Sequence, residues 1–224
     1  MFSTEDGFKD ALAGVYTAMT KSSLYGRELT YGIVDVVAQQ WGGIGSNHRY
    51  ANALKYEYEA TNTKPIIDTL WNGLYNAIAN ANSILAYIDN SKAVFTGDNK
   101  QIIKGEALAL RAFMHFDLLR LFAPALINDD QGTYVPYVDT YPDIYATSMQ
   151  VTPFLDKVIA DLVKAKTLVA DFDTTAAGIM ASKNGTARMS KAKYLDAKFG
   201  YGDFFAGRGY RLSYYSITAL LARV

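Results

Sequence analysis

The sequence predicts an all-α protein made of tetratricopeptide-like helical hairpins packed as an α-α superhelix. Every strongly periodic segment of the 224 residues repeats its apolar side chains at spacings of three and four, and none alternates at every second residue. Two long segments of this kind are joined by a short polar connection, residues 90–99, which favours an antiparallel helical hairpin.

The first predicted helix begins after Ser3, which can cap it together with Asp6 at the third helical position. Its apolar side chains recur at spacings of four, three and four: Phe8, Leu12, Val15 and Met19. Tyr25 and Gly26 interrupt this pattern, and a shorter apolar helix is expected within residues 29–40.

Residues 41–52 form a glycine-rich, polar segment with aromatic side chains near both ends, which is typical of a loop. Sugar binding needs a flat aromatic face that stacks on a pyranose ring, and polar groups that bond its hydroxyls. That mixture is present here as Trp41, Asn47, Arg49, Tyr50 and Asn52. We expect the glycines to let the backbone hold Trp41 and Tyr50 outward. The alternative is that both rings pack the loop onto the first two helices.

A long helix is predicted to open at Pro65, with Asn62 or Thr63 as its cap. Its apolar residues alternate by four and three: Ile67, Trp71, Leu74, Ile78, Ala81, Leu85 and Ile88. Trp71 falls on this stripe, so we expect it to be a structural core residue.

The segment 105–122 is predicted to be a central helix with two apolar faces, and therefore with neighbours on both sides. Phe113 supplies structural bulk on one face. Arg111 lies on the flank of the apolar stripe, so we expect it to be buried and paired with a carboxylate or carbonyl from another helix. His115 is expected to be a helix residue with a satisfied hydrogen bond.

The remainder of the chain predicts two more helices separated by loops. Residues 128–151 form a long loop, after which Thr152 and Pro153 begin a helix. Residues 171–183 are expected to be a linker, 199–210 a glycine-aromatic loop, and 211–224 an apolar helix.

Composition excludes several functions. The 22 basic and 22 acidic residues cancel, which argues against nucleic acid as a partner, and the absence of cysteine excludes thiolate chemistry. The two histidines form no metal motif, and no nucleophile elbow is present, so no metal site, cofactor or catalytic residue is expected. Adjacent acids such as Asp129 and Asp130 are more typical of turns than of glycoside hydrolysis.

Two motifs resemble the SusD/RagB family. One is the tryptophan helix that starts at Trp71 and carries a late Ala81-Asn82. The other is the central helix with Gly105-Glu106-Ala107, Leu110-Arg111-Ala112-Phe113 and an aromatic-rich end. Similar segments near Val135-Pro136 and at the C-terminal helix extend the resemblance to nearly all of residues 1–224, as the N-terminal helical domain of a family whose C-terminal part these residues lack.

The resemblance implies a surface-exposed lipoprotein of the Bacteroidetes outer membrane that binds glycans or other nutrients and passes them to a SusC-like TonB-dependent transporter. Its membrane contact would be a lipid anchor that these residues do not contain. Two alternatives stay open from the residues alone: a tetratricopeptide-like protein-interaction scaffold and, less favoured, a glycan-cleaving enzyme.

Overall fold

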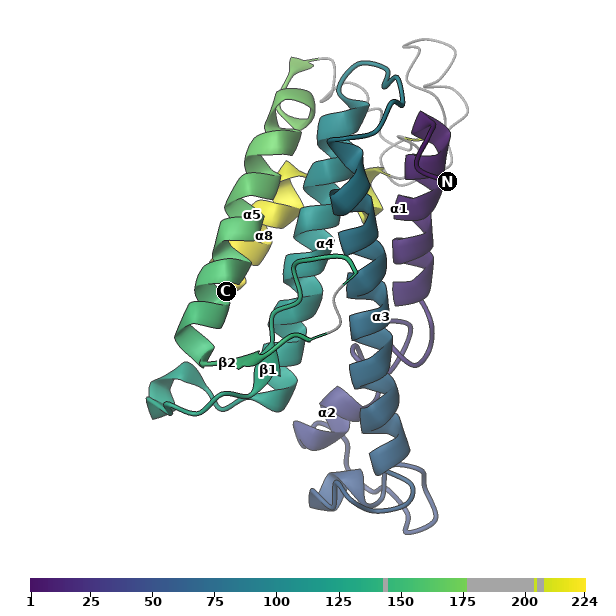
Figure 1. Cartoon of the computed structure of the whole chain (residues 1–224). Coiled ribbons are helices and arrows are strands. Elements are labelled where there is room, and N and C mark those ends of the chain that lie inside the picture. The colour runs from purple at the N-terminus through teal and green to yellow at the C-terminus, as the bar shows by residue number, and fades with distance from the viewer. Residues whose placement is uncertain (143–144, 177–203, 205–207) are drawn as a thin grey trace. The chain divides into compact units, whose positions relative to one another are not determined.

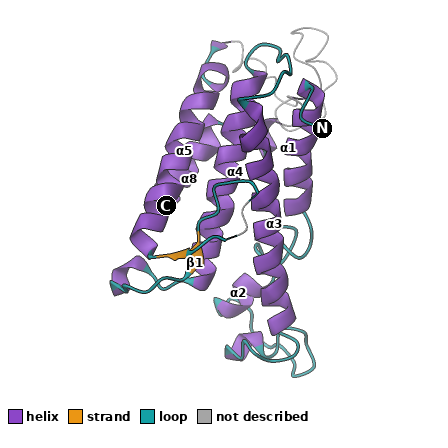
Figure 2. Ribbon diagram, viewed as in Figure 1, coloured by secondary structure: helices purple, strands orange, loops and turns teal. Residues whose placement is uncertain are grey.

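The computed structural model describes residues 1–142, 145–176, 204 and 208–224. Figure 2 shows that the described chain is mostly helical, with one short pair of strands, and this confirms the predicted all-α fold class. The helices are α1 (Glu5–Met19), α2 (Ile33–Val37), α3 (Lys64–Ile88), α4 (Asn99–Phe122), α5 (Val151–Asp173) and α8 (Tyr214–Arg223), with short 3-10 turns at Ala53–Lys55, Leu126–Asn128 and Arg208–Tyr210. Strands β1 (Val135–Pro136) and β2 (Ser148–Met149) pair antiparallel, with Val135 opposite Met149.

The chain divides into two compact units. The larger unit comprises Met1–Leu12 and Ala81–Val224, and the smaller unit comprises Ala13–Asn80.

Helix α4 forms the core of the larger unit, and α5 packs against it while α8 packs against α5 (Figure 1). Almost every α4 side chain from Ile102 to Leu119 is buried, as two apolar faces require, although Phe113 remains partly exposed. Gly105 lets the two long helices approach closely. A β-carbon there would lie 2.6 Å from Val169 Cγ1 and 3.1 Å from the Ala165 carbonyl oxygen of α5.

Arg111 is buried and paired, as predicted. Its Nε and Nη2 atoms donate to the two carboxylate oxygens of Asp161 on α5, at 2.7 and 2.8 Å. Its Nη1 atom donates to Asn82 Oδ1 at 2.9 Å and to the Asp139 carbonyl at 3.0 Å. The hydroxyl of Tyr137 donates to the same Asp161 carboxylate at 2.5 Å. One guanidinium therefore joins α4 to α5, to the end of α3 and to the loop after β1.

The prediction for His115 is also confirmed. The side chain is fully buried, its Nδ1 lies 2.9 Å from the Arg111 carbonyl oxygen, and Nε2 accepts the Val138 N–H at 3.0 Å. This pairing requires the neutral imidazole with its proton on Nδ1. Burial lowers the pKa of His115 from 6.5 to about 3, so the ring stays neutral at physiological pH.

A second ion network joins α4 to the segment before α8. Glu106 is fully buried and accepts from Arg208 Nη1 at 2.6 Å and from Arg211 Nη2 at 2.7 Å. Arg208 also donates through Nη2 to Asp173, at the end of α5, at 2.7 Å. The Tyr214 N–H, which opens α8, donates to the same Asp173 oxygen at 2.8 Å.

The buried stripe of α3 differs from the predicted one near both ends. At the N-terminal end Ile66 and Leu70 are buried, whereas Ile67 and Trp71 are only partly covered. The Trp71 ring instead lies 5.0 Å from the ring of Tyr75 on the flank of the helix. Consecutive positions lie about 100° apart around a helix, so Leu70 faces the core while the indole, with its polar N–H, lies at the edge of the stripe. Near the C-terminal end Ile84 is buried and the predicted Leu85 is only partly covered.

Several predicted boundaries also shift. Thr4 rather than Ser3 caps α1, because Thr4 Oγ1 accepts the Gly7 N–H at 3.2 Å. Helix α2 occupies only Ile33–Val37 of the expected segment, and α5 begins at Val151, before the predicted Thr152–Pro153 start. Most of the predicted linker 171–183 and of the loop 199–210 lies outside the described residues, although 171–173 still belong to α5.

Candidate functional site

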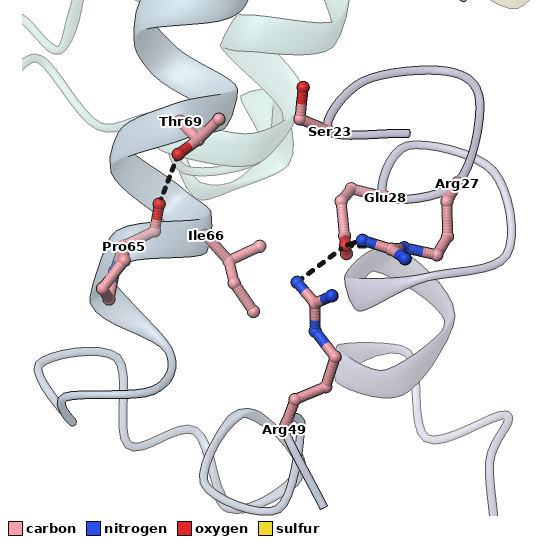
Figure 3. A pocket seen from close by; sticks show the side chains of 7 residues that line it. All are labelled: Ser23, Arg27, Glu28, Arg49, Pro65, Ile66 and Thr69. Atoms are coloured by element: carbon pink, nitrogen blue, oxygen red, sulfur yellow. Dashed lines mark hydrogen bonds and ion pairs between the residues drawn. The ribbon is translucent and has the colours of Figure 1, made fainter. Parts of the chain in front are cut away.

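A buried carboxylate, Glu28, organises the part of the smaller unit that carries the predicted site. Its side chain is only 2% exposed, yet the structure gives it four different donors. Arg27 donates through Nε at 2.9 Å and lies within 2.8 Å through Nη2, and Arg49 Nη2 lies at 3.2 Å (Figure 3). The Ile33 N–H donates at 3.1 Å, which fixes the start of α2.

Tyr50 supplies the fourth donor. Its hydroxyl lies 2.9 and 2.8 Å from the two Glu28 oxygens, and the residue is buried. Burial, followed by the hydrogen bond to Glu28, raises the pKa of Tyr50, so the phenol keeps its proton. The expectation that the loop holds this ring outward is therefore wrong. A tyrosine hydroxyl that leaves water needs an acceptor, and Glu28 provides one inside the unit.

Trp41 contacts the buried tyrosine but is itself only partly covered. Its ring meets Tyr50 edge-on, with the centroids 5.9 Å apart, and lies 6.2 Å from the ring of His48. His48 is held by the loop, because its Nδ1 accepts the Tyr50 N–H at 3.2 Å. The Trp41 indole therefore packs against a ring that is held in place, and part of its own surface remains accessible.

The two asparagines of the predicted site have different environments. Asn47 is exposed at the tip of the loop. Asn52 is committed to the fold, because its Nδ2 donates to Glu57 and its Oδ1 accepts from Asn62 Nδ2 at 3.1 Å. Of the five predicted residues, Asn47 and Arg49 are exposed and Trp41 is partly exposed. Tyr50 contacts Trp41 and Arg49 from inside the unit, whereas Asn52 bonds to Glu57 and Asn62.

A shallow pocket of about 260 Å³ opens beside this loop, and Figure 3 shows its lining. The lining residues are Ser23, Arg27, Glu28, Arg49, Pro65, Ile66 and Thr69, all from the smaller unit. One wall carries the two guanidinium groups held by Glu28. The facing wall is formed by the first two turns of α3, which supply the apolar side chains of Pro65 and Ile66 and the Thr69 hydroxyl.

Sequence reasoning did not identify Glu28 or Arg27 as part of the site. Both lie between the two predicted helices, in a stretch without periodicity. An adjacent Arg-Glu pair before a buried helix is a weak signal, and the Tyr50 partner lies 22 residues away, so only the folded chain joins them.

Arginine donors, hydroxyls and a partly exposed indole suit polar ligands with apolar faces. Among the described residues, no group of three histidine, cysteine or acidic side chains is placed to hold a metal ion.

The fold is that of SusD-like helical proteins. A SusD superfamily protein from Bacteroides thetaiotaomicron VPI-5482 superimposes with a TM-score of 0.67 at 20% identity, covering 98% of this chain and 42% of that one. A SusD-like carbohydrate binding protein from Bacteroides vulgatus ATCC 8482 gives a TM-score of 0.64 at 18% identity, covering 99% of this chain and 41% of that one. The chain therefore spans less than half the length of these structures.

The chain belongs to the SusD-like family described as "Starch-binding associating with outer membrane", which matches residues 7–189. This confirms the family resemblance that the two helix motifs carry. Comparison with the curated proteins finds no match to this chain. No helix in the described part of the chain combines the length and apolar character needed to cross a membrane.

Proposed function

We propose that this chain is the N-terminal helical domain of a glycan-binding lipoprotein, and that it serves a TonB-dependent uptake complex in the outer membrane. Family membership supports this proposal, since the family description combines starch binding with outer-membrane association. A role in binding rather than in cleavage agrees with the chemistry of the site, which offers donors and an aromatic surface.

Within this chain, the observation that supports the proposal most directly is the partly exposed indole of Trp41. The Trp41 ring packs edge-on against Tyr50, and Tyr50 is held by its hydrogen bond to Glu28. A ring that is already held in place loses little conformational entropy when a ligand stacks on it. Arg49 and Asn47 lie on the same loop and can donate to sugar hydroxyls. One stacked ring with a few hydroxyl bonds gives weak binding, with dissociation constants on the order of tens of μM to mM.

The chain offers a sharp test, because it contains two tryptophans, Trp41 and Trp71. Trp71→Phe leaves Trp41 as the sole indole, so a glycan that stacks on it should change the emission of this variant. Calorimetric titration should show weaker binding for Trp41→Ala and unchanged binding for Trp71→Phe. If Trp41→Ala, at parent stability, binds a glycan as well as the parent does, the loop is not the site.

The partnership needs a separate experiment. Affinity purification of the natural protein from detergent-extracted outer membranes should recover a TonB-dependent transporter in stoichiometric amount. Recovery of the protein without any such transporter would contradict this part of the proposal.

A further inference from the structure

The pocket beside the loop has a feature that neutral sugar binding does not require, namely two arginines converging on one acid. Arg27, Arg49 and Glu28 together leave one positive charge on the pocket wall. Glu28 is the one acid among the seven lining residues, all of which belong to the described chain. Both of its oxygens already accept hydrogen bonds and its side chain is 2% exposed.

The two guanidinium groups remain accessible while they are held in place. The Arg27 side chain is 35% exposed and that of Arg49 is 46% exposed, although both contact Glu28. Arg49 is steadied further because its guanidinium lies 5.0 Å from the centroid of the Tyr50 ring. N–H donors are therefore far more exposed to an entering ligand than the Glu28 carboxylate is. Donors fixed before binding lose little entropy when they bind.

The opposite wall and the size of the pocket narrow the class of ligand. Pro65 and buried Ile66 offer an apolar surface, and the Thr69 hydroxyl, which donates to the Pro65 carbonyl at 2.6 Å, can accept from a ligand hydroxyl. A volume of about 260 Å³ lies below the roughly 300–1,000 Å³ of pockets that enclose drug-sized molecules, so it suits a single sugar ring.

We propose that this pocket binds the carboxylate of an acidic sugar unit, a uronic acid, through Arg27 and Arg49. Guanidinium groups match the planar carboxylate with paired hydrogen bonds, and such charge-assisted bonds are about twice as strong as neutral ones. Glu28 acts as the positioning residue that aims both arginines. The inference rests on the proposed glycan-binding function and names the class of glycan that this site prefers.

The test compares an oligogalacturonate with its methyl ester, which keeps the sugar ring but removes the charge. Calorimetric titration of the protein should show about tenfold or greater preference for the acid, as expected when charge-assisted hydrogen bonds are lost. Arg49→Gln should reduce the affinity for the acid to that for the ester, and Arg49→Lys should fall between. Lys55→Gln removes an exposed cation outside the pocket lining and should keep the preference.

The outcomes separate the two proposals. Equal affinity for acid and ester, or an acid preference that Arg49→Gln leaves intact, overturns the assignment of this pocket. If neutral oligosaccharides still bind in a manner that depends on Trp41, the proposed function stands without it. If sulfated oligosaccharides bind more tightly than the uronate, the site selects an anion but not a carboxylate, and the assignment fails. Absence of binding to any oligosaccharide overturns both proposals.

Discussion

Replacing Arg111 by alanine should lower the free energy of unfolding by about 3 kcal/mol, near the lower end of the cost of breaking a buried ion pair from one side. The change removes the two bonds to Asp161 at 2.7 and 2.8 Å, together with those to Asn82 and the Asp139 carbonyl. The Asp161 side chain is only 13% exposed and would keep the Tyr137 hydroxyl as a donor. That remaining bond is why the lower end of the range applies.

Urea unfolding followed by far-ultraviolet circular dichroism measures the free energy of unfolding. In thermal unfolding, the melting temperature should fall by about 6–12 °C for a chain of this size. The same helix offers a matched control, because Arg120 is 53% exposed and pairs with Asp117 at 3.3 Å. Arg120→Ala should cost less than about 1 kcal/mol. Adding Asp161→Asn to Arg111→Ala should recover part of the loss by removing the stranded charge. If the two alanine variants lose equal stability, the reasoning about the buried pair is refuted.

Two further predictions concern α4. The pKa of His115 is about 3 in the folded chain and near 6.5 in the unfolded chain, so between these pH values the unfolded state binds more protons. The free energy of unfolding should therefore fall by about 1.4 kcal/mol per pH unit as the pH drops below 6.5. His115→Gln should flatten that slope in urea unfolding at several pH values, whereas the exposed His48→Gln should retain it, and identical slopes in all three proteins would contradict the assignment. Gly105→Ala should destabilise by about 1–3 kcal/mol, since the added carbon meets Val169 Cγ1 at 2.6 Å. Gly14→Ala in α1 has open space around it and should instead raise the melting temperature, so a loss at Gly14 equal to that at Gly105 would count against the close-packing argument.

The sequence predicted best where local spacing decides the outcome. The apolar stripe of α1 is buried at Phe8, Leu12, Val15 and Met19, as its periodicity indicates. Arg111 could be recognised as a buried, paired residue from its place on the flank of an apolar helix. Its partner could not be named, because Asp161 lies 50 residues away on another helix. Periodicity shows which face is buried, and not which element covers it.

The errors arise where two local patterns compete. On α3, the rows through Leu70 and Trp71 both lead to Leu74 at helical spacing, so the periodicity alone does not choose between them. In the loop, a tyrosine followed by polar residues gives no sign of whether its hydroxyl faces water or a buried acid. Tyr50 faces inward because Glu28, 22 residues away in the sequence, accepts a hydrogen bond from its hydroxyl.

The pairing of Arg208 with Asp173 has a consequence for how the segment that leads into α8 is held. The ion pair fixes the end of α5 beside the start of the segment that leads into α8, and Glu106 secures the same arginine from α4. A single guanidinium thus holds the segment that leads into α8 to two helices at once, and one substitution, Arg208→Ala, would remove both of these ion pairs together.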